Sequence, residues 1–432
     1  MTAVIATNQT ILVVGGGISG ITAALEAAEC GKQVVLIEKN PSLGGRVSQL
    51  YKYFPKLCFP TCGLEINLRR IKANRNIHLL TQAEVEQVRG TPGDFSVTIR
   101  QRPRYVTEAC TACGDCARAV TTEFGDEFNY GMNRHKGAYL PFNLAYPQRY
   151  VIDERLIGTA DAKAAQEACK ANAINLDMKE EVITLKAGAI IWATGWKPYD
   201  AAAIQPYGYD RFQNVITNME FERMLDPFGP TAGQIRRPSD GCVPKSIAFI
   251  QCAGSRDRNH LEHCSRVCCM ATLKQTTYVR EQLGDTAKSS VYYIDIRAID
   301  RIDDFHRRVK EDPNVSFIKS KVASITEDAA TKDVFLHGND LEKPGVGSDM
   351  RYKKRHDLVV LAVGMAPSVP NNQIPAEIRT NPNGFIEVTP GSGIYGAGVS
   401  SEALDVNRAV QNATAAALRA IQVINRVAGV EG

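Results

Sequence analysis

Three cysteines that lie close together have the spacing of an iron–sulfur ligand set. Residues 110–116 read Cys-Thr-Ala-Cys-Gly-Asp-Cys, which places thiols at Cys110, Cys113 and Cys116. This C-x2-C-x2-C spacing is typical of [4Fe–4S] ligation, and in bacterial runs a fourth cysteine follows four residues later. Here that position holds Val120. A complete cluster at this run therefore needs a cysteine from elsewhere in the chain.

A second, incomplete cysteine run supplies the missing thiolate. The segment 167–174, around Cys169, resembles the end of the second half of a two-cluster ferredoxin. In those proteins the fourth cysteine of each run binds the other cluster. The remaining cysteine positions of this half hold Thr159, Ala162 and Ala165. The missing cysteines thus all belong to the same cluster. One complete [4Fe–4S] site is therefore expected, with the ligands Cys110, Cys113, Cys116 and Cys169. The alternative is that these cysteines are small buried hydrophobes.

Four further cysteines gather in the second half of the chain with the spacing C-x11-C-x3-C-C. They are Cys252, Cys264, Cys268 and Cys269. Four soft thiolates without a nearby carboxylate favour a second iron–sulfur cluster, with zinc or unligated thiols as the alternatives. Disulfides are not expected, because nothing in the chain marks it for an oxidising compartment.

The N-terminal segment has the pattern of a dinucleotide-binding turn. An apolar run at 10–14 leads into Gly-Gly-Gly-Ile-Ser-Gly, then a helical stretch, and a second apolar run ends at Glu38. Strand, glycine turn and helix, with an acid about 20 residues on, form the fingerprint of a dinucleotide site. The helix N-terminus stabilises phosphate charge, and Glu38 is placed to accept from a ribose hydroxyl. The expected binding residues of the turn are Gly15, Gly17, Ile18, Ser19 and Gly20.

Several later segments favour FAD as the dinucleotide. Residues 39–46 resemble the second glycine turn of flavoproteins with two dinucleotide-binding domains, and the apolar runs that end at Gly195 and Gly364 resemble their crossover strands. Residues 393–398 resemble the strand over the flavin side chain, although Val399 stands where that family has Asp. The resemblance implies FAD contacts from Lys39, Gly44, Gly45, Arg46, Gly195, Gly364, Gly398 and Val399.

The inserted second nucleotide domain of such flavoproteins would bind NAD(P)H, but its glycine turn is missing here. A strand at 246–250 is followed by Gln-Cys-Ala-Gly-Ser-Arg-Asp, in which only Gly254 remains of the glycines. We therefore expect the nicotinamide site to be lost. Our hypothesis is that the group at Cys252–Cys269 replaces nicotinamide as the electron partner of the flavin.

Residues 48–67, 139–148 and 252–269 make a more specific resemblance, to the flavin subunit family of heterodisulfide reductase (HdrA). Full-length members add an N-terminal domain and a C-terminal two-cluster ferredoxin, which this chain of 432 residues does not show. The resemblance is strongest to the short branch that serves quinone-interacting membrane-bound oxidoreductase complexes. It implies two partners, a second HdrA-like flavoprotein and a membrane protein of the complex, and electron exchange with adenylylsulfate reductase in dissimilatory sulfur metabolism. The alternative is a soluble heterodisulfide-reductase-like subunit that acts on a disulfide or thiol, or that bifurcates electrons.

The expected fold is α/β, with two thioredoxin-reductase-like Rossmann domains and a ferredoxin-like insertion. The expected segments are the FAD domain, first part (1–102), the insertion (103–176), a return to the FAD domain (177–242), the vestigial nucleotide domain (243–350) and the FAD domain, second part (351–432).

Composition narrows the range of partners and locations. The formal net charge is only +4, without the clustered basic footprint that nucleic-acid binding needs. No apolar stretch approaches the ~20 residues that span a bilayer. We expect a cytoplasmic oxidoreductase subunit that is attached, if at all, to the inner face of the membrane through its partners.

Three roles are possible for Cys58 and Cys62: they could bind a cluster, form a redox pair, or take part only in packing. We assign no catalytic residue. The functional alternatives are an electron-transfer subunit, a self-sufficient flavoenzyme that reduces disulfides through Cys58 and Cys62, and a scaffold whose clusters are structural. The direction of electron flow is open.

Overall fold

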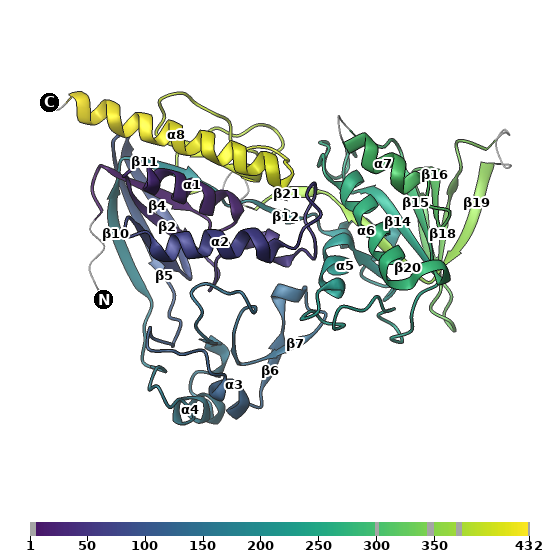
Figure 1. Ribbon diagram of the computed structural model, residues 1–432, viewed down its shortest axis with the longest axis horizontal. Coiled ribbons are helices and arrows are strands. Elements are labelled where there is room, and N and C mark those ends of the chain that lie inside the picture. The colour runs from purple at the N-terminus through teal and green to yellow at the C-terminus, as the bar shows by residue number, and fades with distance from the viewer. Residues whose placement is uncertain (1–5, 299–301, 344–349, 369–373, 431–432) are drawn as a thin grey trace.

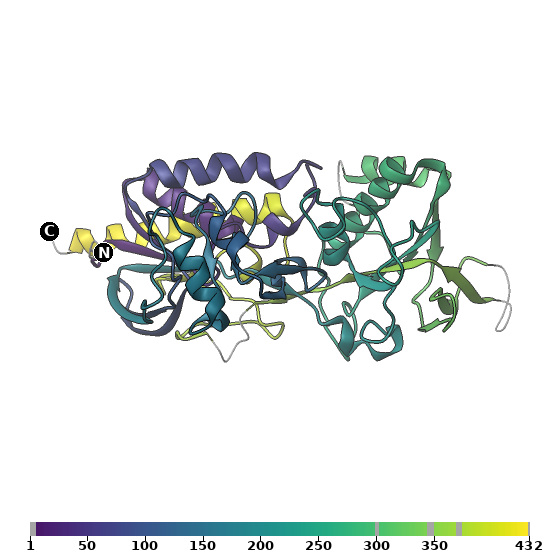
Figure 2. The same cartoon turned by 90° about the horizontal axis from the view of Figure 1, so that it is seen from below.

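The molecule consists of two α/β lobes and a smaller third unit (Figure 1). The computed structural model describes residues 6–298, 302–343, 350–368 and 374–430. Each large lobe is built on a five-stranded parallel sheet. Figure 2 shows the two lobes side by side, with extended segments running between them.

The sheet of the first lobe has the order β22-β11-β1-β2-β3. Its strands are β1 (Thr10–Val14), β2 (Gln33–Glu38), β3 (Ile77–Thr81), β11 (Ala189–Trp192) and β22 (Ile394–Gly396). Every residue of β1 is buried, because both faces of the sheet are covered.

Alternate residues of the strands face different layers. Ile11 and Val13 pack with helices α1 (Ile18–Glu29) and α8 (Val406–Val430), and α2 (Pro60–Ala73) joins them. Leu12 and Val14 pack on an antiparallel sheet of β4 (Ala83–Thr91), β5 (Asp94–Gln101) and β10 (Glu181–Ala187).

The sheet of the second lobe has the order β13-β20-β14-β15-β16. Its strands are β13 (Val215–Thr217), β14 (Ser246–Ala253), β15 (Lys288–Tyr293), β16 (Val315–Lys319) and β20 (Leu358–Val363). Helices α5 (Asn218–Leu225), α6 (Cys268–Leu283) and α7 (Ile302–Lys310) belong to this lobe. An antiparallel sheet of β17 (Ser324–Glu327), β18 (Val334–Asn339) and β19 (Arg351–His356) completes it.

Two strands of the second sheet come from segments assigned to the FAD domain from sequence. β13 lies within 177–242 and β20 within 351–432, and both pair in the second sheet. The connection between the lobes is the antiparallel pair β12 (Trp196–Pro198) and β21 (Met365–Pro367), which directly follow Gly195 and Gly364. These short strands bring both chain crossings to one place.

The third unit hangs below the first lobe and contains the cysteine run (Figure 1). It comprises α3 (Asp115–Ala119), β6 (Glu123–Gly125), β7 (Arg134–Lys136), β8 (Ala138–Tyr139), β9 (Val151–Ile152) and α4 (Ala160–Glu167). Val120, Ala162 and Ala165, at positions that would carry cysteines of a second cluster, are buried in its apolar core. Apolar packing thus fills these positions, while Thr159 caps α4.

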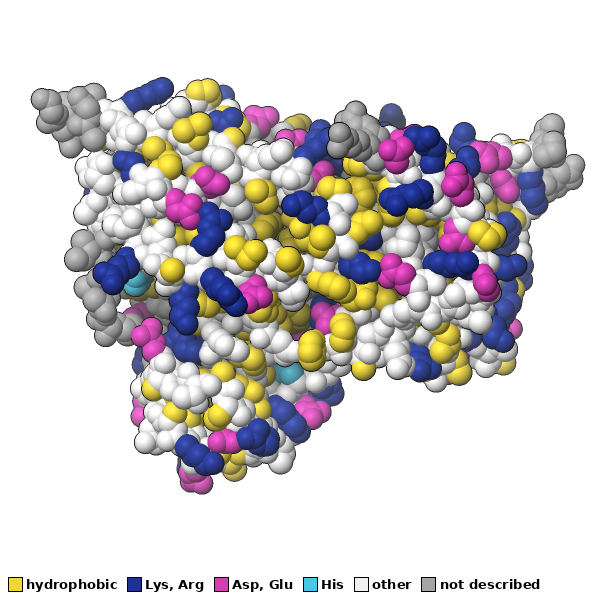
Figure 3. Space-filling view, in the orientation of Figure 1, with side chains coloured by type: hydrophobic (Ala, Val, Ile, Leu, Met, Phe, Trp, Pro, Cys, Tyr) yellow, Lys and Arg dark blue, Asp and Glu magenta, His cyan; other side chains and the backbone are white. Residues whose placement is uncertain are grey.

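Among the described residues, no helix combines the length and apolar character needed to cross a membrane. On the face in Figure 3, apolar side chains gather where the two lobes meet, and charges of both signs are spread over the periphery.

Candidate functional site

The glycine turn after β1 has no room for side chains at two positions. Gly15 has φ +110, and a Cβ there would lie 2.4 Å from the carbonyl oxygen of Ala193. A Cβ at Gly20 would lie 1.7 Å from the carbonyl oxygen of Gly15. A side chain at Gly15 would collide with the backbone after β11, and one at Gly20 would push α1 away from the turn and displace its N-terminus, where a phosphate is expected to bind.

Glu38, the last residue of β2, holds this turn in place. One carboxylate oxygen accepts from the Gly16 N–H at 2.6 Å, and the other accepts from the Asn40 N–H at 2.8 Å. Burial raises the pKa of this carboxyl, and both backbone hydrogen bonds oppose that rise. Glu38 also faces the pocket next to the turn, where a ribose would meet it.

A single long pocket starts at this turn and collects most of the predicted cofactor residues. Those that line it are Gly15, Gly17, Ile18, Ser19, Glu38, Lys39, Gly45, Arg46, Gly195 and Val399. Gly20, Gly44, Gly364 and Gly398 are not among the residues that line it. A Cβ at Gly398 would lie 1.9 Å from the hydroxyl of the lining residue Ser19, and one at Gly364 would lie 2.2 Å from the Ser255 hydroxyl.

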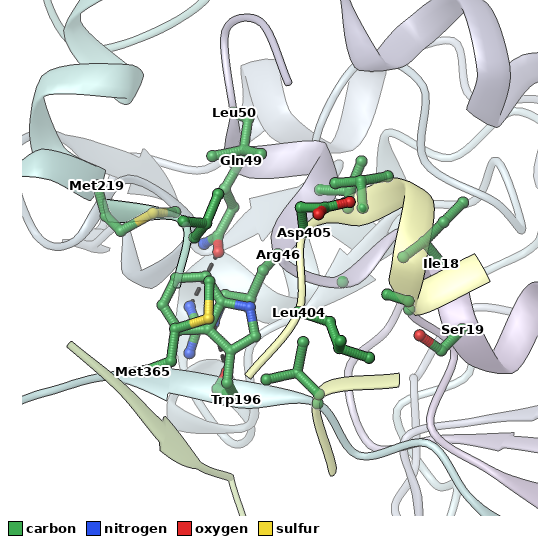
Figure 4. A pocket seen from close by; sticks show the side chains of 18 of the residues that line it. Ile18, Ser19, Arg46, Gln49, Leu50, Trp196, Met219, Met365, Leu404 and Asp405 are labelled. Atoms are coloured by element: carbon green, nitrogen blue, oxygen red, sulfur yellow. Dashed lines mark hydrogen bonds between the residues drawn. The ribbon is translucent and has the colours of Figure 1, made fainter. Parts of the chain in front are cut away.

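Arg46 ties the pocket to the insertion. Its guanidinium donates to the Trp196 carbonyl at 3.2 Å and to the Gln49 amide oxygen at 2.9 Å (Figure 4). It also donates to the hydroxyl of Tyr130, a residue of the insertion, at 3.2 Å. The buried Arg223 of α5 donates to the Asn129 side chain of the insertion at 2.6 Å. The insertion is thus fixed to both lobes beside the pocket.

The far end of the pocket lies against the second lobe and was not foreseen from sequence. It is lined by Asn218, Met219, Glu222, Ala271, Lys274 and Gln275. Lys274 and Glu222 form an ion pair at 2.9 Å, and their side chains are 3% and 2% exposed. No motif marks this pair, because its members lie on different helices.

Glu222 is surrounded by donors. Its carboxylate accepts from Lys274, from the Gln275 amide at 2.8 Å, and from the Tyr51 N–H at 3.0 Å. Such a charge is tolerated in the interior only when it is paired and hydrogen-bonded. The pocket thus runs from an acid at the end of β2, past two glycine turns, to a buried cation. This arrangement of groups fits a dinucleotide whose diphosphate lies at the turns.

The four cysteines predicted for the insertion come together. Cys110, Cys113, Cys116 and Cys169 line one small cavity, together with Tyr150. Burial raises the pKa of Cys116 to about 11, and the neighbouring Cys110, Cys169 and Cys113 add to the rise. The backbone N–H groups of Ala112 and Ala173 point at the sulfurs of Cys110 and Cys169, at 3.4 and 3.3 Å. Such donors tune cluster thiolates, so the residues fit a [4Fe–4S] cluster.

Three of the four cysteines predicted for the second group are in contact. The thiol of Cys268 donates to Cys252 and lowers the pKa of Cys252 to about 7, and Cys269 adjoins Cys268. Cys264 lies in the preceding loop, half-buried, and lines a polar hollow with Arg256 and Arg297. Its sulfur accepts from the Arg266 N–H at 3.3 Å.

Within the described ranges, no three His, Cys, Asp or Glu side chains converge in a way that would hold a single metal ion. In a [4Fe–4S] cluster the thiolates bind the iron atoms of a larger body. The cysteines of the insertion surround such a cavity, whereas among the described cavities Cys264 lines one without Cys252, Cys268 and Cys269, so the second cluster stays a prediction.

The loop after β14, where a nicotinamide nucleotide would bind, carries charged side chains and borders the polar hollow next to Cys264. Arg256, from this loop, pairs with Asp295 after β15 at 2.6 Å. Gly254 packs against Tyr199. The loss of the nucleotide site stays a prediction.

Cys58 and Cys62 lie at the start of α2 and are both exposed. Phe54 and Leu50, from the same loop, line the flavin pocket. The three possible roles of the two cysteines remain predictions.

Comparisons with known proteins agree with the sequence resemblance. The family model for FAD-dependent oxidoreductases matches residues 10–196. An A-type iron–sulfur subunit of CoB–CoM heterodisulfide reductase from Methanopyrus kandleri is 38% identical, over 95% of this chain and 63% of the relative. The A-type subunit of H2:CoB–CoM heterodisulfide, ferredoxin reductase from Methanothermobacter thermautotrophicus is 36% identical, over 96% of this chain and 64% of the relative.

Solved structures show the fold. Thioredoxin reductase from Lactococcus lactis has a TM-score of 0.51 at 12% identity and covers 97% of this chain and 99% of its own. That from T. acidophilum has a TM-score of 0.50 at 13% identity, with 96% and 98% covered. The predicted α/β fold with two Rossmann-like domains is confirmed.

The chain spans less than two thirds of the length of these HdrA relatives. Residues 10–196 match the FAD-dependent oxidoreductase family, and over nearly its whole length the chain is similar to HdrA subunits.

Proposed function

We propose that this chain is an FAD- and iron–sulfur-containing electron-transfer subunit of the QmoA type. In this role it exchanges electrons between a quinone-linked complex and adenylylsulfate reductase in dissimilatory sulfur metabolism. The position of one cysteine pair is the observation that supports a role in electron transfer. Cys268 and Cys269 open α6 between Val267 and Ala271, which both line the flavin pocket. A cluster held there would be a direct neighbour of the flavin.

The chain's own residues would give each cofactor a fixed place. FAD, when bound, supplies a two-electron carrier beside one-electron clusters. The glycine turns and the N-terminus of α1 bind its diphosphate, and the Lys274–Glu222 pair places a cation at the opposite end of the pocket. The Arg46 and Arg223 contacts hold the insertion, which carries the Cys110–Cys169 group, against both lobes.

The electron port to partners would be the insertion. Cys113 is exposed and Cys110 and Cys169 are half-buried, so a cluster there would lie close to the surface. We propose that the neighbours in the complex are a second HdrA-like flavoprotein and a membrane subunit, with the chain on the cytoplasmic side of the membrane.

A second candidate is a heterodisulfide-reductase-like subunit that acts on a disulfide or thiol or that bifurcates electrons. The names of the methanogen relatives, which refer to heterodisulfide reductase, favour it. The exposed pair Cys58 and Cys62 is the dithiol that this function would use. Replacement of both by serine should abolish disulfide reduction with FAD and iron content unchanged. Under the first proposal the same variant keeps its electron exchange with adenylylsulfate reductase.

The replacement of nicotinamide by a cysteine-bound cluster can be tested directly. We expect that NADH and NADPH, added anaerobically to the purified protein, leave the FAD absorbance near 450 nm (roughly where oxidised flavins absorb) unbleached. Dithionite should bleach it. Fast stoichiometric bleaching by either nucleotide would refute the proposal, whereas reduction only through an added partner supports it.

A further inference from the structure

The inner end of the flavin pocket carries a buried hydrogen-bond acceptor that the protein leaves unused. Gln275 is 1% exposed and lines this end of the pocket. Within the described part of the chain its amide oxygen has no hydrogen-bond partner. An unsatisfied buried acceptor destabilises the folded protein. Such a group in a pocket wall indicates a donor on the ligand.

The orientation of this amide is fixed by its neighbours. The Gln275 nitrogen donates to the Glu222 carboxylate at 2.8 Å and to the backbone carbonyl of Asn218 at 2.9 Å. A flipped amide would set its oxygen against both of these acceptors. The assignment of nitrogen and oxygen therefore follows from the hydrogen-bond network, and it is the oxygen that lacks a partner.

A second acceptor of the same kind lies beside it. The side-chain oxygen of Asn218, the first residue of α5, is also buried and has no partner among the described residues. Asn218 lines the same part of the pocket. Helices α5 and α6 thus each carry one such amide oxygen on a residue that lines the pocket, and Lys274 lines it as well.

The chemistry of FAD supplies one matching donor. Its diphosphate belongs at the glycine turns, so its ring belongs at the opposite end of the pocket, where Asn218, Lys274 and Gln275 lie. An oxidised flavin ring has a single N–H group, the imide N–H between two carbonyl groups. We infer that the amide oxygen of Gln275, with that of Asn218 beside it, accepts this imide N–H and sets the position of the ring. The inference depends on FAD binding alone and not on the proposed partners.

Binding of 3-methyl-FAD tests this, because its ring lacks the imide N–H. We expect flavin-free protein, prepared anaerobically, to bind FAD about tenfold more tightly than 3-methyl-FAD, as for the loss of one hydrogen bond. Gln275→Met should bind FAD about tenfold more weakly and lose most of this preference. Asn218→Ala, which keeps the backbone carbonyl, should reduce the preference in part.

Gln251→Met is the matched control. Gln251 is also a buried amide without a partner among the described residues, but it does not line the pocket. This variant should keep the wild-type preference for FAD. Equal binding of the two flavins by the wild-type protein would overturn the inference, and so would an unchanged preference in Gln275→Met and Asn218→Ala. In that case the two oxygens bind ordered water. Because no partner protein enters the assay, its result is independent of the proposed function.

Discussion

At the scale of single residues, the flavin pocket contains a buried ion pair, formed by Lys274 and Glu222. Both charges are almost fully removed from water, yet each contacts further polar groups of the first lobe. Lys274 donates to the backbone carbonyl of Lys52, and Glu222 accepts from Tyr51. The pair therefore stabilises the contact between the lobes and orients the groups at the end of the pocket.

Lys274→Met should lower the free energy of unfolding by about 3–5 kcal/mol, because it leaves the Glu222 carboxylate buried and unpaired. Urea denaturation of the flavin-free protein measures this. Lys321→Met is the control: it breaks an exposed pair with Asp257 of similar length, 2.8 Å, and should cost at most about 1 kcal/mol. The double variant Lys274→Met with Glu222→Leu should recover part of the loss. Equal effects of Lys274→Met and Lys321→Met would contradict the expected role.

Sequence predicts residues whose role follows from local spacing. Gly15 and Gly20 are fixed by the close approach of turn and helix, and the four cysteines of the insertion by a ligand pattern. Lys274 and Glu222 carry no such signal, because their meeting depends on how α5 and α6 pack. The position of Cys264, apart from the contact of Cys252, Cys268 and Cys269, depends on a loop conformation that spacing does not define.

At the scale of elements, the insertion holds one cysteine group on helices and loops of its own. Its helices α3 and α4 pack around an apolar core, and its contacts to the lobes include Asn129, Tyr130 and Tyr146. Its cysteine group and the glycine turns of the flavin pocket use different elements. Loss of one should leave the other in place.

Cys169→Ala should reduce iron and acid-labile sulfide by about four atoms each per chain, the content of one [4Fe–4S] cluster. FAD content should stay at the wild-type value. Iron analysis and flavin extraction from anaerobically purified protein measure both. Cys30→Ala, which changes an exposed cysteine outside either group, should leave all three values unchanged. Unchanged iron in Cys169→Ala would refute the assignment of this ligand.

The order of the strands in the two sheets could not be predicted from the sequence. The runs that end at Gly195 and Gly364 were predicted as crossover strands, and both glycines do precede the crossing pair β12 and β21. The runs themselves are inner strands of two different sheets. Continuous apolar runs look the same in any buried parallel strand, so only pairing shows which sheet each joins.

At the scale of the whole molecule, stability depends on a neutral histidine in the second lobe. His356, at the end of β19, is 3% exposed. Its ring nitrogens lie 2.9 Å from the Ser246 hydroxyl and 2.8 Å from the Tyr292 hydroxyl. Burial lowers the pKa of His356 to about 4, with a further contribution from Lys354.

Because the folded-state pKa lies below the usual histidine value of about 6.5, the unfolded chain takes up the proton first as pH falls. The contribution of His356 to the free energy of unfolding is therefore complete above pH ~6.5. It declines as the pH falls from ~6.5 to ~4, by up to about 3 kcal/mol. Urea denaturation of the flavin-free protein at pH 7.5 and pH 5, values chosen as roughly either side of the histidine range, measures it. His356→Gln should show a smaller difference between the two conditions. An equal difference in both proteins would show that other groups govern the acid sensitivity.

The apolar core of the insertion has a consequence for how the protein is made. A small domain whose interior consists of clusters folds only as the metal arrives, because metal binding is then its folding energy. Here Val120, Ala162 and Ala165 are buried in an apolar core instead. We therefore expect this part of the insertion to fold before any iron is delivered. The four thiols would then form a preformed site, and chains made without iron would remain folded and able to take up a cluster later.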